Sequence, residues 1–120
     1  MAVEPSQRSR DHASRVRNAR DSLLTPNAAS MLGPVRDALC EPTRTQIVRA
    51  LSNGPLSVGE LARILDRSKS ATSQHLRVLR DGGVVMPRRR GRAVIYSLAP
   101  APMVEAVVNV LDRAATIAAA

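Results

Sequence analysis

The stretch LSVGELARILDRSKSATSQHLRVLRDGG, residues 56–83, contains two short amphipathic segments separated by a DRS turn. Ser57 stands three residues before Glu60, which is the spacing of a capping box. In a capping box each of the two side chains satisfies a backbone N–H at the start of a helix. The stretch therefore predicts two helices joined by a tight turn, over about residues 58–65 and 69–81.

The second of these helices has a polar face as well as clear ends. Ser68 is a candidate N-cap, and Gly82-Gly83 is a candidate terminator. Short hydroxyls, an amide and a guanidinium fall at i, i+3, i+4 and i+7: Ser70, Ser73, Gln74 and Arg77. Such groups can bond base edges and phosphates in a major groove, whereas the alternative is an ordinary solvated helix face. Four further residues of this helix are expected to pack into the core together with Leu76: Ala71, Thr72, Val78 and Leu79.

A basic segment follows at once, VVMPRRRGRAVIYSL, residues 84–98. Its valines and isoleucine are typical of strands, and Arg90-Gly91 is the expected turn of a β-hairpin. The tip is rich in arginine: Arg88, Arg89, Arg90 and Arg92. A protruding turn can bring these side chains to phosphates or into a minor groove. The alternative is that they solubilise the tip or guard an edge strand.

Further helices are expected on both sides of this region. EPTRTQIVRALSNGP predicts a helix that begins at Pro42 and stops at Asn53-Gly54-Pro55. Residues 22–40 predict a broken helix, because Pro26 and Gly33-Pro34 interrupt its apolar spacing. The last segment, residues 102–120, predicts a helix whose polar side chains form only a narrow stripe.

Composition sets limits on the class of protein. The 120 residues are enough for one domain, and the core must be aliphatic because Tyr96 is the only aromatic residue. Dimerisation would stabilise such a chain. The 18 basic residues exceed the 10 acidic ones, for a formal net charge of +8, which favours a polyanionic partner. No apolar run is long enough to span a membrane and no signal peptide is evident, so we expect a cytoplasmic protein.

Residues 1–21 differ from the rest of the chain. They lack a periodic apolar face, and so we expect a flexible arm in front of a single domain over residues 22–120. The arm contains five arginines: Arg8, Arg10, Arg15, Arg17 and Arg20. Their positive charge favours contact with DNA phosphates or a minor groove, and a solvated tail is the alternative.

Residues 35–98 resemble the ArsR/SmtB family of bacterial winged helix-turn-helix repressors. The similarity lies in EPTR at a helix start, LSVGELA, the SQHL segment and the pattern G-R-x-x-x-Y. It implies a mainly α fold with a small β-hairpin (α+β), and DNA contact from Lys69 together with the polar face described above. It also implies a homodimer through the first and last helices. The interface residues expected on the last helix are Met103, Val107, Val110, Leu111 and Ala114.

The metal ligands of many relatives have no counterpart in this sequence. The helix over residues 58–65 has neither Cys nor His, and the last helix offers only Glu105 and Asp112. We expect a packing or DNA-proximal role for His75 and a solvated position for His12. No metal site and no cofactor are therefore predicted. No arrangement of side chains typical of catalysis is present either, so an enzyme is not expected.

The signal that such a regulator would sense stays open. Cys40 is interpreted as a small buried thiol, with redox or electrophile sensing as the alternative. A separate signal-sensing protein partner, or no small-molecule signal at all, is favoured over sensing through Cys40.

These patterns favour a dimeric, sequence-specific regulator that binds a double-stranded DNA operator. The main alternative is an architectural protein that coats DNA by charge alone. Single-stranded DNA or RNA binding is disfavoured because stacking surfaces need aromatic side chains. A module that only binds other proteins would leave the arginine-rich hairpin unexplained.

Overall fold

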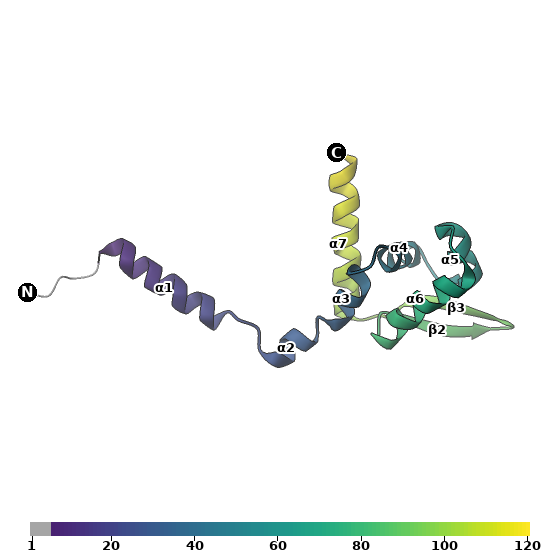
Figure 1. Ribbon diagram of the computed structural model, residues 1–120, viewed down its shortest axis with the longest axis horizontal. Coiled ribbons are helices and arrows are strands. Elements are labelled where there is room, and N and C mark those ends of the chain that lie inside the picture. Colours follow the sequence, from purple (N-terminus) through teal and green to yellow (C-terminus); the bar gives the residue numbers. More distant parts are fainter. Residues whose placement is uncertain (1–5) are drawn as a thin grey trace, which may run out of the picture. The chain divides into compact units, whose positions relative to one another are not determined.

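The computed structural model describes residues 6–120, and the chain divides into two units, Met1–Ser30 and Met31–Ala120 (Figure 1). The division falls after Ser30 rather than after residue 21, where the sequence analysis expects it. The described part of the first unit contains α1, Gln7–Asp21, and α2, Pro26–Ser30. The described part of the predicted arm is therefore mostly helical, and its flexibility stays a prediction.

Local polar contacts explain the helix α1, which buries no residue. The Ser6 hydroxyl caps it by accepting the Ser9 N–H at 3.1 Å. Within the first turns the Gln7 amide donates to the Asp11 carboxylate at 2.9 Å, and Arg10 donates to Gln7. Pairs spaced three or four residues apart stabilise a helix without any core, and an apolar face is not needed for them. The apolar spacing used for the sequence prediction does not detect this kind of helix.

The second unit contains the predicted helices. The break near Gly33-Pro34 separates α2 from α3. The elements of this unit are α3 (Gly33–Leu39), α4 (Pro42–Leu51), β1 (Leu56–Ser57), α5 (Val58–Leu65), α6 (Lys69–Asp81), β2 (Val85–Arg90), β3 (Ala93–Leu98) and α7 (Pro102–Ala119). The helices predicted at Pro42, over residues 58–65 and over 69–81 are confirmed at these bounds.

An aliphatic core joins these elements. Ile47, Leu61, Leu76 and Leu79 are fully buried, and the same cluster includes valines of α4, β2 and α7. Tyr96 packs against its edge. Helix α3 contacts both α4 and α7, so the first and last helices of this unit lie together on one side of the core. Among residues 6–120, no helix has both the length and the apolar character needed to cross a membrane.

The helix-turn-helix begins with the predicted capping box. The Ser57 N–H donates to the Glu60 carboxylate at 2.9 Å, and the Glu60 N–H donates to the Ser57 hydroxyl at 3.1 Å. Asp66 ends α5 in the left-handed region with φ of 53°, a conformation that its short polar side chain tolerates. Ser68 then caps α6 by accepting the Ala71 N–H at 3.0 Å. The turn between α5 and α6 is therefore bounded by a defined helix end at Asp66 and a capped helix start at Ser68, and the angle between the two helices depends on this turn.

The capping box gives the first prediction. The hydrogen bonds from Ser57 hold the pKa of the Glu60 carboxyl below its usual value of 4.5. Stability from the ionised carboxylate is therefore present above that value and is lost as the pH falls through the lowered pKa. Glu60→Gln should weaken this part of the acid dependence when urea unfolding is compared at about pH 6 and about pH 3.5. An acid dependence identical to that of the wild type would contradict the prediction. Ser57→Ala should cost about 0.5–2 kcal/mol at neutral pH.

The hairpin is part of a three-stranded antiparallel sheet with the order β1-β3-β2. The strand β1 was not predicted, because its two residues are too few to show an alternating pattern. Residues 91–92 form the turn, one position later than predicted, and Gly91 has a φ of 62° that suits glycine. Pro87 is tolerated because β2 is an edge strand. In Figure 1 the tip of the hairpin projects past α5 and α6.

Candidate nucleic-acid interface

The polar face of α6 lies open to solvent. All five predicted contact residues are exposed: Lys69, Ser70, Ser73, Gln74 and Arg77. Their side chains make none of the intramolecular hydrogen bonds or ion pairs found in the described part of the chain. Hydroxyl, amide and guanidinium groups therefore stand together on one face with their bonding capacity unused, which is the arrangement that base-edge and phosphate contacts need.

The opposite face of α6 fixes the helix to the core. Leu76 and Leu79 are fully buried, and so is Thr72, whose hydroxyl donates to the Ser68 carbonyl at 2.8 Å. The buried threonine therefore has a hydrogen-bond partner. Val78 departs from the prediction, since its side chain is 37% exposed rather than packed inward. It lies at the edge of the polar face.

The start of α4 is also linked to α6. Glu41 caps α4 by accepting the Arg44 N–H at 2.9 Å, and its carboxylate lies 3.7 Å from Nδ1 of His75 on α6. The backbone hydrogen bond from Arg44, and secondarily the charge of His75, lower the pKa of the Glu41 carboxyl. The half-buried His75 therefore lies beside the start of α4.

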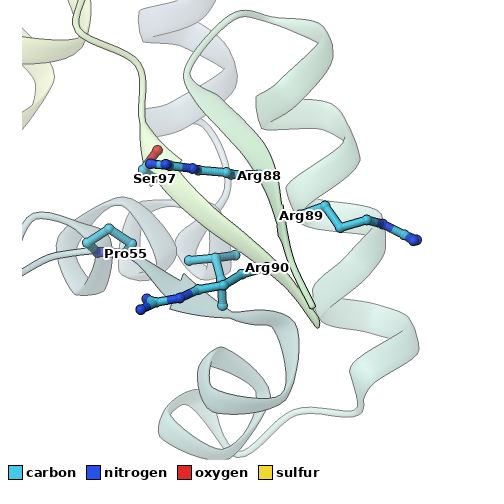
Figure 2. A pocket seen from close by; sticks show the side chains of 6 residues that line it. Pro55, Arg88, Arg89, Arg90 and Ser97 are labelled. Atoms are coloured by element: carbon cyan, nitrogen blue, oxygen red, sulfur yellow. The ribbon is translucent and has the colours of Figure 1, made fainter. Parts of the chain in front are cut away.

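The hairpin arginines do not form one cluster. Arg88 and Arg90 alternate with Arg89 along β2, so their side chains leave opposite faces of the sheet. Figure 2 shows Arg88 and Arg90 extending to one side, near Ser97 and Pro55, while Arg89 extends to the other. Arg92 lies in the turn. All four arginines are exposed. Their division between two faces was not predicted, although the alternation of side chains along a strand implies it.

Cys40 differs from the interpretation as a buried thiol, because it is exposed at the C-terminal end of α3. The chain turns there toward α4, which leaves the side chain outside the core. Arg44 reaches back to this turn, donating to the Asp37 carbonyl at 2.7 Å and to the Cys40 sulfur at 3.2 Å. The thiol therefore takes part in the junction of the two helices.

Within residues 6–120, the acidic side chains of α7 do not belong to a cluster of metal-ligating side chains. Asp112 forms an ion pair with Arg49 of α4, and Glu105 is exposed in the first turn. In residues 6–120 no three His, Cys, Asp or Glu side chains come together in one protomer as a metal site. His12 lies exposed on α1.

The residues expected at a dimer interface on α7 fall into two groups. Val107 is only 1% exposed and belongs to the protomer's own core, and Leu111 packs against that core. Met103 is half-buried. Val110 and Ala114 instead line an open apolar groove of about 550 Å³, together with Asn109, Arg113 and Ile117. Ile117, which is 63% exposed, was not among the predicted residues, although it follows Val110 and Ala114 at helical spacing.

A capped helix-turn-helix, an exposed polar second helix and an arginine-tipped hairpin together define a winged helix-turn-helix protein. The sequence profile of the bacterial regulatory protein, arsR family, matches residues 41–86. The HTH-type transcriptional regulator NmtR of Mycobacterium tuberculosis is 40% identical over 87 residues, which cover 72% of this chain and 72% of NmtR. The chain belongs to the ArsR/SmtB family of transcription regulators.

Solved structures share the fold. HlyU from Vibrio cholerae has a TM-score of 0.69 and 35% identity, and the match covers 74% of this chain and 96% of HlyU. The homodimeric winged helix-turn-helix DNA-binding domain of Mb0332 from Mycobacterium bovis has a TM-score of 0.61 and 26% identity. That match covers 81% of this chain and 89% of the Mb0332 domain. We call α6 the recognition helix and the β2–β3 hairpin the wing from here on.

Proposed function

We propose that this regulator is a homodimer that binds a twofold-symmetric DNA operator, with the polar face of the recognition helix in the major groove. The observation that carries the proposal is the unused hydrogen-bonding capacity of Ser70, Ser73 and Gln74 on that face. A protein that coats DNA by charge would need only arginines and lysines there. Lys69 and Arg77 add phosphate contacts at the two ends of the face.

The dimer is proposed through α3 and α7. The exposed apolar groove along Val110, Ala114 and Ile117 is unsuited to contact with water, and α3 lies beside α7 in the same protomer. A second copy of the chain would cover this groove and place two recognition helices on one duplex. The homodimeric Mb0332 domain supports this assignment.

The direct test is chemical protection of the DNA upstream of the protein's own gene. A symmetric dimer should protect two half-sites whose centres lie about 10 base pairs, or a multiple of that, apart on one face of the duplex. Continuous protection with no such symmetry would favour the architectural alternative.

For regulation we propose one of two arrangements. Either a separate partner protein senses the signal, or the protein responds to no small-molecule signal. The sequence supports this assignment, because the helix over residues 58–65 has neither Cys nor His and α7 offers only Glu105 and Asp112 as ligand types. A redox role for Cys40 stays as the third possibility. Comparing operator affinity before and after mild oxidation, with Cys40→Ser as control, distinguishes it from the other two.

The arm provides a further prediction. Helix α1 has five exposed arginines and only Asp11 and Asp21 as acidic residues, and we propose that it binds DNA phosphates beside the operator. Deleting residues 1–21 should leave thermal stability nearly unchanged, because α1 buries no residue. It should lower DNA affinity and reduce the slope of log K against log salt, by about 0.9 for each lost phosphate contact.

Arg15→Gln/Arg17→Gln is the matched variant for this deletion, since it removes charge while keeping good helix formers. It should reproduce part of the reduction in slope. An unchanged affinity and slope at low salt for both variants would show that the arm is a solvated tail.

A further inference from the structure

His75 lies where the recognition helix meets the start of α4. Its side chain is 25% exposed, and it stands between Gln74 on the exposed polar face and Leu76, which is fully buried. The Nδ1 atom of His75 is 3.7 Å from Oε2 of Glu41. Among residues 6–120 this is the only contact of ion-pair distance between the recognition helix and another element. A side chain next to a proposed base contact is therefore linked to a different helix.

Glu41 is a fixed partner for the histidine ring. Its carboxylate accepts the Arg44 N–H at 2.9 Å and so caps α4. This hydrogen bond lowers the pKa of the Glu41 carboxyl from its usual value of 4.5, so the carboxylate stays ionised between about pH 6 and about pH 8. The negative charge therefore stays in one place over the range in which an imidazole ordinarily gains or loses its proton.

The contact between His75 and Glu41 has two states, because an imidazole ordinarily changes its charge between about pH 5 and about pH 8. A distance of 3.7 Å is too long for a hydrogen bond, but it is short enough for attraction between opposite charges. A protonated His75 is therefore attracted to Glu41, whereas a neutral His75 only packs beside it. The ion pair is present at the lower pH and is lost as the pH rises.

No charge on the recognition helix itself competes with Glu41 for His75. Side chains three or four residues apart are neighbours on a helix surface. At these distances from His75 all the residues are uncharged: Ala71, Thr72, Val78 and Leu79.

The elements packed against the recognition helix, α3, α4, α5 and β2, also leave Glu41 as the partner of His75. Within residues 6–120 no other carboxylate is in ion-pair contact with the ring. The Arg44 guanidinium donates to the Asp37 carbonyl, and the Asp37 carboxylate lies beside Gly82 at the C-terminal end of the recognition helix. The other charged or titratable side chains of these elements are exposed or bonded elsewhere: Arg36, Cys40, Arg49, Glu60, Arg63 and the three arginines of β2.

The position of this contact matters for DNA recognition. Leu76 and Leu79 anchor the buried side of the recognition helix, and the contact with Glu41 lies beside its polar face. Side chains that make specific contacts have to be held within about 0.5 Å and about 10–20° of the productive geometry. Because His75 directly follows Gln74, a shift of this edge of the helix relative to α4 displaces the Gln74 amide.

We infer that His75 is a positioning residue for DNA recognition, whose ion pair with Glu41 holds the recognition helix against α4 so that Gln74 meets its base. The inference rests on the proposed function and extends it to a residue that acts through another side chain. Sequence discrimination, and not only overall affinity, should therefore fall as the pH rises from about 6 to about 8. The two side chains are 25% and 33% exposed, so the expected change is modest, about 2- to 5-fold.

The discrimination is the ratio of dissociation constants for a shuffled duplex and for the upstream duplex, measured at about pH 6 and about pH 8 at constant ionic strength. For the wild type the ratio should be about 2- to 5-fold larger at the lower pH. Added attraction of a protonated protein to phosphates acts on both duplexes and cancels in the ratio. His12→Gln is the matched control, because His12 is the other histidine of the chain and is exposed on α1. It should keep the wild-type pH dependence.

Three substitutions at the pair separate positioning from direct contact with DNA. Glu41→Gln keeps an oxygen that can cap α4 but removes the carboxylate, His75→Gln is uncharged at both pH values, and His75→Lys is charged at both. The first two should show the lower ratio at both pH values, and His75→Lys should show the higher one. A ratio that still changes with pH in Glu41→Gln would overturn the inference, because His75 would then act on the DNA directly.

A double-mutant cycle in urea tests the ion pair without DNA and verifies that the variants fold. The effects of Glu41→Gln and His75→Gln on the free energy of unfolding should be non-additive at about pH 6 and additive at about pH 8. Additivity at both pH values would also overturn the inference. If the wild type prefers the upstream duplex at neither pH, the proposed function fails and the positioning role fails with it, whereas a non-additive cycle would still establish the ion pair.

Discussion

Val110→Glu is expected to convert the proposed dimer into monomers and to lower operator affinity by about 100-fold or more. Val110 is 53% exposed in the protomer and lines the apolar groove of α7, so a carboxylate there costs the protomer little. In the proposed dimer the two copies of the groove would meet, and each carboxylate would lose its water. Two linked half-sites typically bind 10²–10⁴-fold more tightly than one, and this gain would be lost.

Light scattering measures the mass of the Val110→Glu protein, and a DNA titration measures its affinity. Ile64→Glu is the matched control for mass, because Ile64 is 59% exposed but lies on α5, outside the groove. It should remain a dimer. A Val110→Glu protein that keeps twice the chain mass would place the interface elsewhere. Val107 was also expected at the interface, but its substitution would not test the dimer, because it would disrupt the core of each protomer.

The second large effect is expected on the recognition helix. Gln74→Ala should reduce the preference for operator over shuffled DNA by about 1–3 kcal/mol, the contribution of one good bidentate contact to a base. Affinity for the shuffled duplex and the salt slope should stay near the wild-type values, because no phosphate contact is removed. Competition titrations at two salt concentrations measure both quantities.

Gln46→Ala provides the control for this substitution. Gln46 is an exposed glutamine on a different helix, α4, and its removal should leave the preference unchanged. Equal losses on operator and shuffled DNA for Gln74→Ala would mean that the side chain contacts the backbone rather than a base.

Local signals in the sequence predicted most of the helix-turn-helix. The capping box at Ser57 and Glu60, the N-cap at Ser68 and the stop at Gly82 all lie within a few residues of the bonds they form. Such short-range chemistry can be inferred without knowing the tertiary structure. The polar face of α6 is likewise set by the helical repeat.

Features that depend on tertiary contacts were harder to predict. The apolar face of α7 is broad enough to serve both the core and an interface, and periodicity alone cannot assign Val107 to one and Val110 to the other. The strand β1 exists because it pairs with β3. Cys40 was expected to be buried because of its residue type, but the turn between α3 and α4 leaves it exposed.

The central claim is that this protein reads a DNA sequence. The most direct measurement is the ratio of dissociation constants for the upstream duplex and for a shuffled duplex of the same composition, at physiological salt. The predicted ratio is about 10³ or more in favour of the upstream duplex, as specific regulators show. A ratio near one, with both affinities falling together as salt rises, would contradict the claim and identify a protein that binds DNA by charge alone.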